Sequence, residues 1–329
     1  MSNTLRQFLS LKTLDQEYFL AECKPIFTPS NVDRLIETFD SFDSDSDLHL
    51  DARDCATFKR RWVRPLLETC ENAALIIVDF QNDFISGRLA ISNGPAAQDP
   101  EKAIPKINKI IDTVGNQLKT VVYTFDWHPE DHISFFENRQ MRPLAAEFAN
   151  NAEELSVFQT VRFARPAIEQ TLWPAHCVQD SWGAELHPQL TFANSAQKVF
   201  KGTNSDVDSY SAFFDNQKLS KTELDAKLRA KRIKSVLICG LAYDVCVAAT
   251  ATDALTLGYR TVLVEDCCAG LDEKKIAETR KLLVDKGCAM LKCDEAIQLI
   301  QGKMIPMAWA SNRPNDSTGQ HRSRFCRLL

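Results

Sequence analysis

The sequence predicts an α/β fold with a doubly wound, mainly parallel sheet, and two patterns support this prediction. From residue 75 onward, short apolar runs rich in β-branched residues alternate with longer amphipathic segments, which is typical of successive βαβ units. The runs at 75–80, 120–125 and 235–241 are almost continuously apolar rather than alternating. Strands of this kind are covered by helices on both faces, so we expect a buried parallel sheet.

The predicted elements follow one another in regular order. We expect strands at 75–80, 120–125, 198–201, 235–241, 261–265 and 289–292. We expect helices at 100–118, 221–232, 245–257 and 273–286. Residues 1–70 differ because they indicate helices around an acidic loop, whereas 311–329 are polar, rich in turn-forming residues and without periodicity. The chain is therefore divided into a small helical unit at 1–70, an α/β domain at 73–302 and a disordered tail at 311–329.

Composition and charge narrow the classes of function. The 329 residues carry a net charge of −5 and contain no long run of lysine and arginine, so we expect no nucleic-acid partner. No segment approaches the ~18 apolar residues that suggest a membrane span, and the first residues lack the apolar core of a signal peptide. We therefore expect a soluble protein of the cytoplasm, with the nucleus as an alternative compartment and no membrane partner. The 11 cysteines are scattered, odd in number and without a C-x-x-C pair, which favours free thiols.

Chemically reactive side chains follow four of the predicted strands. Asp79 lies at the end of the first strand, Asp126 follows the second, Lys201 ends the third and Cys246 lies just past the fourth. Because ligands of open α/β sheets bind at the carboxyl ends of the strands, we expect these four side chains to meet at one edge of the sheet.

Cys246 is the candidate nucleophile. The segment CGLAYDVCVAATATDAL predicts a strand that turns into a helix, with the thiol in the first helical turn. The positive end of the helix dipole lowers a thiol pKa, and N–H groups of such a turn can bind an oxyanion. Asp79 would then be a general base, and Lys201 a cation that keeps this carboxylate ionised. The alternatives are a small buried cysteine, an aspartate that caps a turn and a surface lysine.

Asp126, His128, His132 and His176 form a candidate metal-binding set. Asp126 and His128 are two residues apart at a strand end, so their side chains point the same way. Carboxylate and imidazole ligands suit zinc or another divalent transition metal with open positions for water or substrate. The alternative is that these histidines cap turns or form hydrogen bonds within the fold.

Five motifs carry these residues in a fixed order: VDFQNDF, DWHPEDHISF, WPAHCVQDSWGAEL, KGTNSDVDSYSAFFDN and GLAYDVCVAATATDA. Together they resemble the signature motifs of the nicotinamidases, within the isochorismatase-like cysteine hydrolases. The resemblance covers residues 73–302 and leaves both ends of the chain outside it. The segment from Ser134 to Leu172, between the two metal motifs, is long and resembles an insertion whose role the sequence does not explain.

The resemblance implies an activity and a role for each candidate residue. Nicotinamide would be hydrolysed to nicotinate and ammonia through a cysteine thioester, a reaction that feeds NAD salvage. The implied catalytic residues are Asp79, Lys201 and Cys246, and the implied zinc ligands are Asp126, His128 and His176, with His132 as a fourth ligand or close neighbour. The implied oxyanion hole is formed by the N–H groups of Ala242 and Cys246, beside a cis peptide bond at Leu241–Ala242, and the implied aromatic pocket walls are Phe84, Trp173 and Tyr210. Self-association into a homo-oligomer is a further implication.

The N-terminal unit contains a candidate calcium loop. Its possible ligand positions match those of an EF-hand loop at Asp43, Asp45, Asp47, His49, Asp51 and Asp54. Two departures weaken the match, since Leu48 replaces the usual glycine and Asp54 replaces the longer glutamate. A calcium-binding loop and a purely structural EF-hand-like loop both remain open, and only a fragment of a partner motif precedes it.

Two other functions compete with nicotinamide hydrolysis. The first keeps the fold and the nucleophile but acts on another small amide, ureide or carbamoyl compound. The second is a calcium-responsive binding protein whose α/β domain is catalytically silent. An ammonia-release assay with nicotinamide, pyrazinamide and ureides separates the three.

Overall fold

The computed structural model describes residues 3–149 and 152–310, which form two compact units. The N-terminal unit comprises residues up to Glu68 together with those from Gly302 onward, and the α/β unit comprises Thr69–Gln301. The predicted tail at 311–329 lies outside the described residues. Among the residues that are described, no helix is both long enough and apolar enough to span a bilayer.

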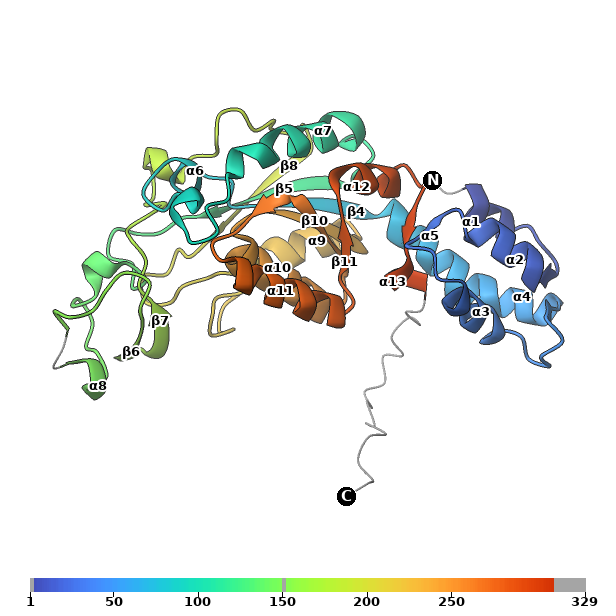
Figure 1. Cartoon of the computed structure of the whole chain (residues 1–329), viewed down its shortest axis with the longest axis horizontal. Helices are drawn as coiled ribbons and strands as arrows, with labels where there is room; N and C mark the ends of the chain where they lie inside the picture. Colours follow the sequence, from blue (N-terminus) through green and yellow to red (C-terminus); the bar gives the residue numbers. More distant parts are fainter. Residues whose placement is uncertain (1–2, 150–151, 311–329) are drawn as a thin grey trace, which may run out of the picture. The chain divides into compact units, whose positions relative to one another are not determined.

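A six-stranded parallel sheet forms the centre of the α/β unit. Its strands are β4 (Ala73–Val78), β5 (Thr120–Asp126), β8 (Ala196–Lys201), β9 (Ser235–Leu241), β10 (Arg260–Ala269) and β11 (Ala289–Leu291). They lie in the order β11-β10-β9-β4-β5-β8, and every neighbouring pair is parallel (Figure 1). All residues of β4, β5 and β9 are buried, which explains their continuously apolar sequences. The predicted fold class is confirmed.

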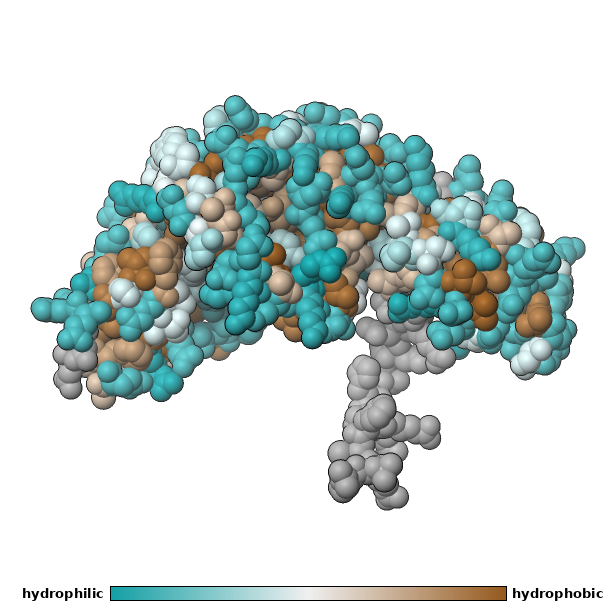
Figure 2. Space-filling view, in the orientation of Figure 1, coloured by the Kyte–Doolittle hydropathy of each residue, from teal (hydrophilic) through white to brown (hydrophobic). Residues whose placement is uncertain are grey.

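Helices cover both faces of this sheet, as Figure 1 shows. One face is covered by the 3₁₀ turn η3 (Pro100–Ala103), α7 (Ile104–Val114) and α12 (Cys293–Ile300). The other face is covered by α9 (Leu224–Ala230), α10 (Ala248–Thr256) and α11 (Glu273–Asp285). Helix α7 buries isoleucines at 104, 107, 110 and 111, the spacing of one helical face. Helix α11 is capped by Asp272, whose carboxylate accepts a hydrogen bond from the Lys275 N–H at 3.0 Å. The outward surfaces of α7 and α11 are mostly hydrophilic in Figure 2.

The strand order indicates where on the sheet edge a ligand would bind. The chain builds β4, β5 and β8 outward in one direction, then returns to β4 and builds β9, β10 and β11 outward in the other. β4 and β9 are therefore the neighbours at which the direction of winding reverses, and ligands of doubly wound sheets bind at the carboxyl ends of such strands. Asp79 follows β4, and Cys246 follows β9.

The segment between the two metal motifs folds into a hairpin that the sequence did not predict. It contains a 3₁₀ turn η4 (Phe136–Asn138), a short helix α8 (Ala146–Ala149) and the antiparallel strands β6 (Thr160–Ala164) and β7 (Ala167–Thr171). The hairpin has its own small core of Ile133, Leu155, Val161, Phe163, Ile168 and Leu172. We call residues 134–172 the insertion.

The N-terminal unit consists of two helix–loop–helix pairs joined by a short sheet. The first pair is α1 (Asn3–Phe8) and α2 (Gln16–Cys23), and the second is α3 (Val32–Asp40) and α4 (Ala52–Phe58); η1 (Lys59–Val63) and α5 (Arg64–Glu71) follow. β1 (Leu14–Asp15) pairs antiparallel with β3 (His49–Leu50), so the second motif has a structural partner that the sequence showed only as a fragment. Phe8, Phe19, Phe39, Phe58 and Trp62 form its aromatic core.

Residues after 302 complete the N-terminal unit. β12 (Ile305–Pro306) pairs in parallel with β2 (Phe27–Thr28), and α13 (Met307–Ala310) follows. The indole N–H of Trp62 donates a hydrogen bond to the Ala310 carbonyl at 2.8 Å. These short elements had no periodic signal in the sequence, because two-residue strands and a single helical turn are fixed by tertiary contacts rather than by local pattern.

Candidate active site

The candidate nucleophile lies where the chain passes from β9 into a helix. Tyr243–Val247 form a single wide turn that continues directly into α10, and Cys246 within it is only 6% exposed. The peptide bond between Leu241 and Ala242 is cis, as the resemblance implies. The Ala242 carbonyl accepts hydrogen bonds from the N–H groups of Val245 and Val247, both at 3.1 Å, and so fixes the turn.

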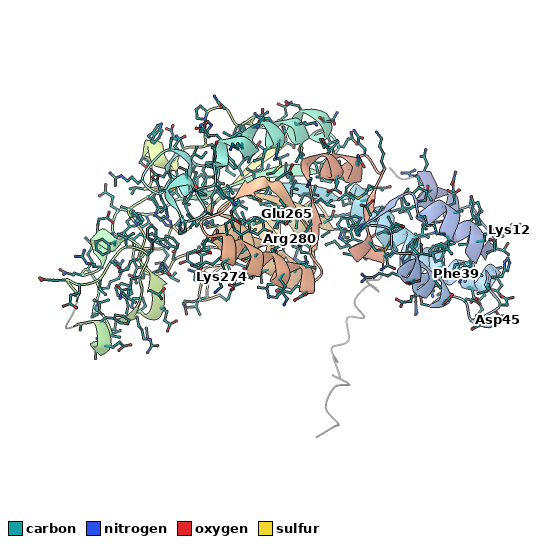
Figure 3. The ribbon with its side chains drawn as sticks, in the orientation of Figure 1. Lys12, Phe39, Asp45, Glu265, Lys274 and Arg280 are labelled. Carbon is teal, nitrogen blue, oxygen red and sulfur yellow. The ribbon has the colours of Figure 1, made fainter. Side chains whose placement is uncertain are left out.

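A polar chain supports this turn from the neighbouring strand. The Tyr243 hydroxyl donates to Glu265 of β10 at 3.2 Å, and the Arg280 guanidinium of α11 donates to the same carboxylate oxygen at 2.8 Å. Figure 3 shows Glu265 and Arg280 side by side. The turn that carries the thiol is thus connected to both β10 and α11.

Lys201 joins the candidate catalytic groups. Its Nζ lies 2.9 Å from Asp79 Oδ2 and 3.4 Å from Cys246 Sγ, donates to the Ser209 carbonyl at 2.9 Å, and also pairs with Asp126. Asp79, Asp126 and Cys246 each offer a ligand atom within 4.8 Å of the others. The four strand-end residues therefore meet in one buried cluster at the sheet edge.

Burial sets the protonation states in this cluster. It raises the pKa of Asp79 to about 6, partly offset by the Lys201 ammonium and by the hydrogen bond that Thr124 Oγ1 donates at 2.6 Å. It would lower the pKa of Lys201, but Asp126 and Asp79 outweigh it and hold that pKa well above its usual range.

The thiol behaves differently from the sequence-based expectation. Burial raises the pKa of Cys246 well above its usual value, and the Lys201 charge offsets this only in part. The expectation of a lowered thiol pKa was wrong, because loss of hydration at this deeply buried side chain, together with the nearby Asp79 and Asp126 carboxylates, raises the pKa. Cys246 therefore rests as a thiol and needs a base. Asp79 and Asp126 both lie within 4.8 Å of it, and Asp79 is the stronger base because its pKa is raised to about 6, whereas the Lys201 ammonium holds the pKa of Asp126 well below its usual range.

Asp126, His128 and His176 converge on one point. Asp126 Oδ2 lies 3.6 Å from His128 Nε2 and 3.8 Å from His176 Nε2. His128 Nδ1 contacts the Gly202 carbonyl at 2.8 Å, and His176 Nδ1 contacts the Pro174 carbonyl at 2.8 Å. A carbonyl oxygen only accepts hydrogen bonds, so each Nδ1 carries a proton, and Nε2 is the nitrogen of each ring that faces Asp126 and would bind a metal ion in the neutral imidazole. This donor set fits a divalent transition metal.

His132 lies beside this set rather than within it. Its ring stacks on His128 with centroids 4.1 Å apart, and its Nδ1 lies 2.7 Å from Ser134 Oγ. A ring nitrogen of His132 lies within 4.8 Å of possible ligand atoms of His128 and Asp208. The Nε2 atom of His132 is buried and has no hydrogen-bond partner among the described residues. Burial lowers the pKa of His132, which keeps the imidazole neutral and able to donate a lone pair.

A pocket opens onto the thiol. Its walls are Phe84, Leu89, Ile91, Asp126, Trp173, His176, Asp208, Tyr210, Ala242, Val245, Cys246 and Leu271. The three predicted aromatic residues and both predicted oxyanion residues therefore line one pocket. The Trp173 indole N–H donates to the Tyr210 hydroxyl at 3.3 Å, which fixes two aromatic walls relative to each other. Asp79 and Lys201 are buried behind this lining.

Sequence reasoning missed two residues of this site. Gln81 is completely buried, and its amide forms hydrogen bonds with both the N–H and the carbonyl of Asp126, at 2.9 and 2.8 Å. Asp208 lines the pocket and lies close to His128 and His132. Both stand within the quoted motifs. For Gln81 the available signal was a polar side chain just after a buried strand, whereas Asp208 lies in the loop after β8 and had no such signal.

In the acidic loop of the N-terminal unit, three of the six candidate calcium ligands lie together and three lie elsewhere. Asp43, Asp45 and Asp47 approach one another within 4.8 Å, and Asp45 lies on the loop labelled in Figure 3. The other three candidates lie outside this trio. Asp54 accepts hydrogen bonds from the N–H and hydroxyl of Ser44, Asp51 caps α4, and His49 belongs to β3. Leu48 adopts a φ of +67°, the left-handed conformation that glycine usually supplies at this loop position.

Comparisons with known proteins agree with this geometry. Residues 73–291 match the family model described as the isochorismatase domain. A nicotinamidase of Escherichia coli is 38% identical over 200 residues, which are 60% of this chain and 84% of that protein. A solved nicotinamidase and pyrazinamidase of Acinetobacter baumannii superposes with a TM-score of 0.58 at 33% identity, covering 68% of this chain and 97% of that one. A solved Pyrococcus horikoshii pyrazinamidase in complex with zinc gives a TM-score of 0.52 at 30% identity, covering 67% and 99%.

Proposed function

Because the chain belongs to the isochorismatase family, we propose that it is a nicotinamidase, which hydrolyses nicotinamide to nicotinate and ammonia through a thioester on Cys246. One observation carries this proposal: the buried cluster of Asp79, Lys201 and Cys246 lies against a pocket with aromatic walls and the anchored imidazole of His176. A flat pyridine ring suits such a pocket, and its carboxamide would face the thiol. The product would feed NAD salvage.

The reaction follows from the protonation states of the cluster. Asp79 takes the proton from Cys246 as the sulfur attacks the carboxamide carbon. The Lys201 ammonium, 3.4 Å from the sulfur, stabilises the developing thiolate. The N–H groups of Ala242 and Cys246 are proposed to hold the oxyanion. Asp79 then returns the proton to the leaving ammonia, and water hydrolyses the thioester with Asp79 again as the base.

Zinc is the proposed metal, held by Asp126, His128 and His176, with His132 as a fourth ligand or close neighbour. When bound there, a divalent ion would hold the substrate ring through its nitrogen or through a bound water. The chemistry of the donors supports this choice, as does the zinc complex of the similar Pyrococcus pyrazinamidase. Elemental analysis of the purified protein should find about one zinc per chain, and His176→Ala should lower that ratio. A wild-type protein free of transition metal, with activity that chelation and metal addition do not change, would contradict the assignment.

An ammonia-release assay tests the function. Wild-type protein should release ammonia from nicotinamide and pyrazinamide but not from ureides, and Cys246→Ala should abolish the release. Cys239→Ala is the matched control, because Cys239 is also fully buried but lies within β9, away from the pocket. Turnover retained by Cys246→Ala would remove the nucleophile, and preference for a ureide would favour the alternative substrate class. No turnover of any amide would favour the catalytically silent protein.

Calcium is the proposed ligand of the N-terminal loop. Loss of hydration and the neighbouring Asp47 and Asp43 raise the pKa of Asp45, so these carboxylates repel one another and a cation would relieve the repulsion. The paired motifs joined by β1 and β3 support an EF-hand-like unit. Calorimetric titration of the full chain with calcium should give saturable heat that Asp43→Asn/Asp45→Asn removes. Absence of heat would favour the purely structural loop. Self-association into a homo-oligomer stays a prediction, which sedimentation would test.

A further inference from the structure

The buried face of the insertion hairpin contains one polar side chain. In β6 and β7 buried and exposed residues alternate, and the buried positions are Val161, Phe163, Ile168 and Gln170. Phe163 pairs with Ile168 and Val161 pairs with Gln170 across the hairpin. Gln170 is only 3% exposed. A buried amide on an apolar face costs free energy unless its hydrogen bonds are made, so its partner identifies what it does there.

That partner lies in the wall of the active-site pocket. Gln170 Nε2 donates to Asp208 Oδ2 at 3.1 Å and to the Thr171 carbonyl at 2.8 Å. Asp208 is only 4% exposed, and its other oxygen accepts a hydrogen bond from the Ser209 N–H at 2.7 Å. A buried carboxylate without donors is strongly disfavoured, so the hydrogen bonds from Gln170 and from the Ser209 N–H hold this carboxylate in place.

The position of Asp208 determines which step this contact affects. Its carboxylate offers an atom within 4.8 Å of ring nitrogens of His128 and His132, on the metal-binding side of the pocket. The groups that would react with the substrate surround Lys201. Among the described residues, no hydrogen bond joins Gln170 to Lys201. A second link, from Trp173 to Tyr210, joins the residue that follows the insertion to the same wall. Asp208 is therefore held from the insertion, and Tyr210 from the residue next to it.

We propose that Gln170 is a positioning residue of the hydrolase, which fixes Asp208 in the pocket wall. Through Gln170 the insertion contributes to the substrate-binding site. This inference rests on the proposed nicotinamidase function. Because Gln170 holds the pocket wall and donates its hydrogen bonds to Asp208 and Thr171 rather than to Lys201 or the thiol, its loss weakens binding of substrate and product while the chemical step is retained.

Two variants of the full, zinc-loaded chain test this role. Gln170→Leu and Gln170→Met keep the volume of the side chain and remove the donor to Asp208. Each should raise KM for nicotinamide about tenfold or more and weaken nicotinate binding by a similar factor, with kcat within about threefold of wild type and unchanged zinc content. Glu169→Gln is the matched control, since Glu169 is the adjacent, exposed residue of β7 and should change neither constant.

The outcomes separate the inference from the function on which it rests. Unchanged KM and nicotinate affinity in both variants of an active enzyme would overturn the positioning role and leave the function intact. The positioning role would also be overturned if kcat and kcat/KM fell by the same factor and the melting temperature fell with them, or if neither variant folded. In either case Gln170 would only support the hairpin. A wild-type protein that neither hydrolyses nicotinamide nor binds nicotinate would overturn the function itself.

Discussion

Replacing Lys201 by methionine should strongly destabilise the α/β unit. Methionine keeps most of the side-chain volume but removes the ammonium that lies 2.9 Å from Asp79 and pairs with Asp126. Both carboxylates are buried, and removing one partner of a buried ion pair costs about 3–5 kcal/mol. We expect the free energy of unfolding to fall by an amount within this range, although two buried carboxylates lose their partner. The reason is that burial already raises the pKa of Asp79 to about 6, so Asp79 can take up a proton when the ammonium is gone.

Urea unfolding of the metal-free variants at about pH 7.5 measures this loss without a contribution from metal binding. Lys198→Met is the matched control: it lies three residues earlier in β8, its side chain is exposed, and its loss should cost no more than about 0.5 kcal/mol. The double variant Lys201→Met/Asp79→Asn should recover part of the stability, since the amide at position 79 needs neither a counter-charge nor the uptake of a proton at about pH 7.5.

A Lys201→Met protein as stable as Lys198→Met would refute this reasoning. So would a double variant that is less stable than Lys201→Met by the full cost of a second, independent substitution. Either result would mean that the ammonium does not compensate the buried carboxylates, and the assignment of charges in the cluster would have to be abandoned.

Two further predictions concern the base and a metal ligand. Because Asp79 must be ionised to accept the thiol proton and burial raises its pKa to about 6, kcat/KM should rise with pH through about 6 and level off above it; a profile that stays flat down to about pH 5 would exclude Asp79 as the base. Gly202→Ala should destabilise the protein and lower its zinc content, because a Cβ at this φ of +64° would lie 2.3 Å from His128 Cε1. Gly258→Ala shares the positive φ but meets no atom within 4 Å, so an equal effect of the two substitutions on zinc content would remove the steric explanation.

The sheet and the central cluster could be predicted from sequence because their signals are strong. β4, β5 and β9 are buried on both faces and are therefore almost continuously apolar. Once parallel strands are assigned, their carboxyl ends share one sheet edge, and this brings Asp79, Lys201 and Cys246 together. The roles of these residues in the reaction remain predictions that the experiments above address.

Other features depend on contacts that no local pattern encodes. The pKa of Cys246 follows from burial beneath the pocket wall, which sequence position does not reveal, and it opposed the expected effect of the helix end. The strands of the insertion hairpin alternate over only five residues each, too short a pattern to separate from the surrounding loop. The contact between Gln170 and Asp208 joins residues far apart in sequence, so only the fold identifies it.

The formation of an acyl-enzyme on Cys246 is the central claim, and mass spectrometry of the protein after acid quenching tests it most directly. During turnover of nicotinamide, the peptide that contains Cys246 should gain the mass of one nicotinoyl group, and the Asp79→Asn variant should form little of this adduct. Ammonia release without any adduct on Cys246, or an adduct on a different cysteine, would contradict the account.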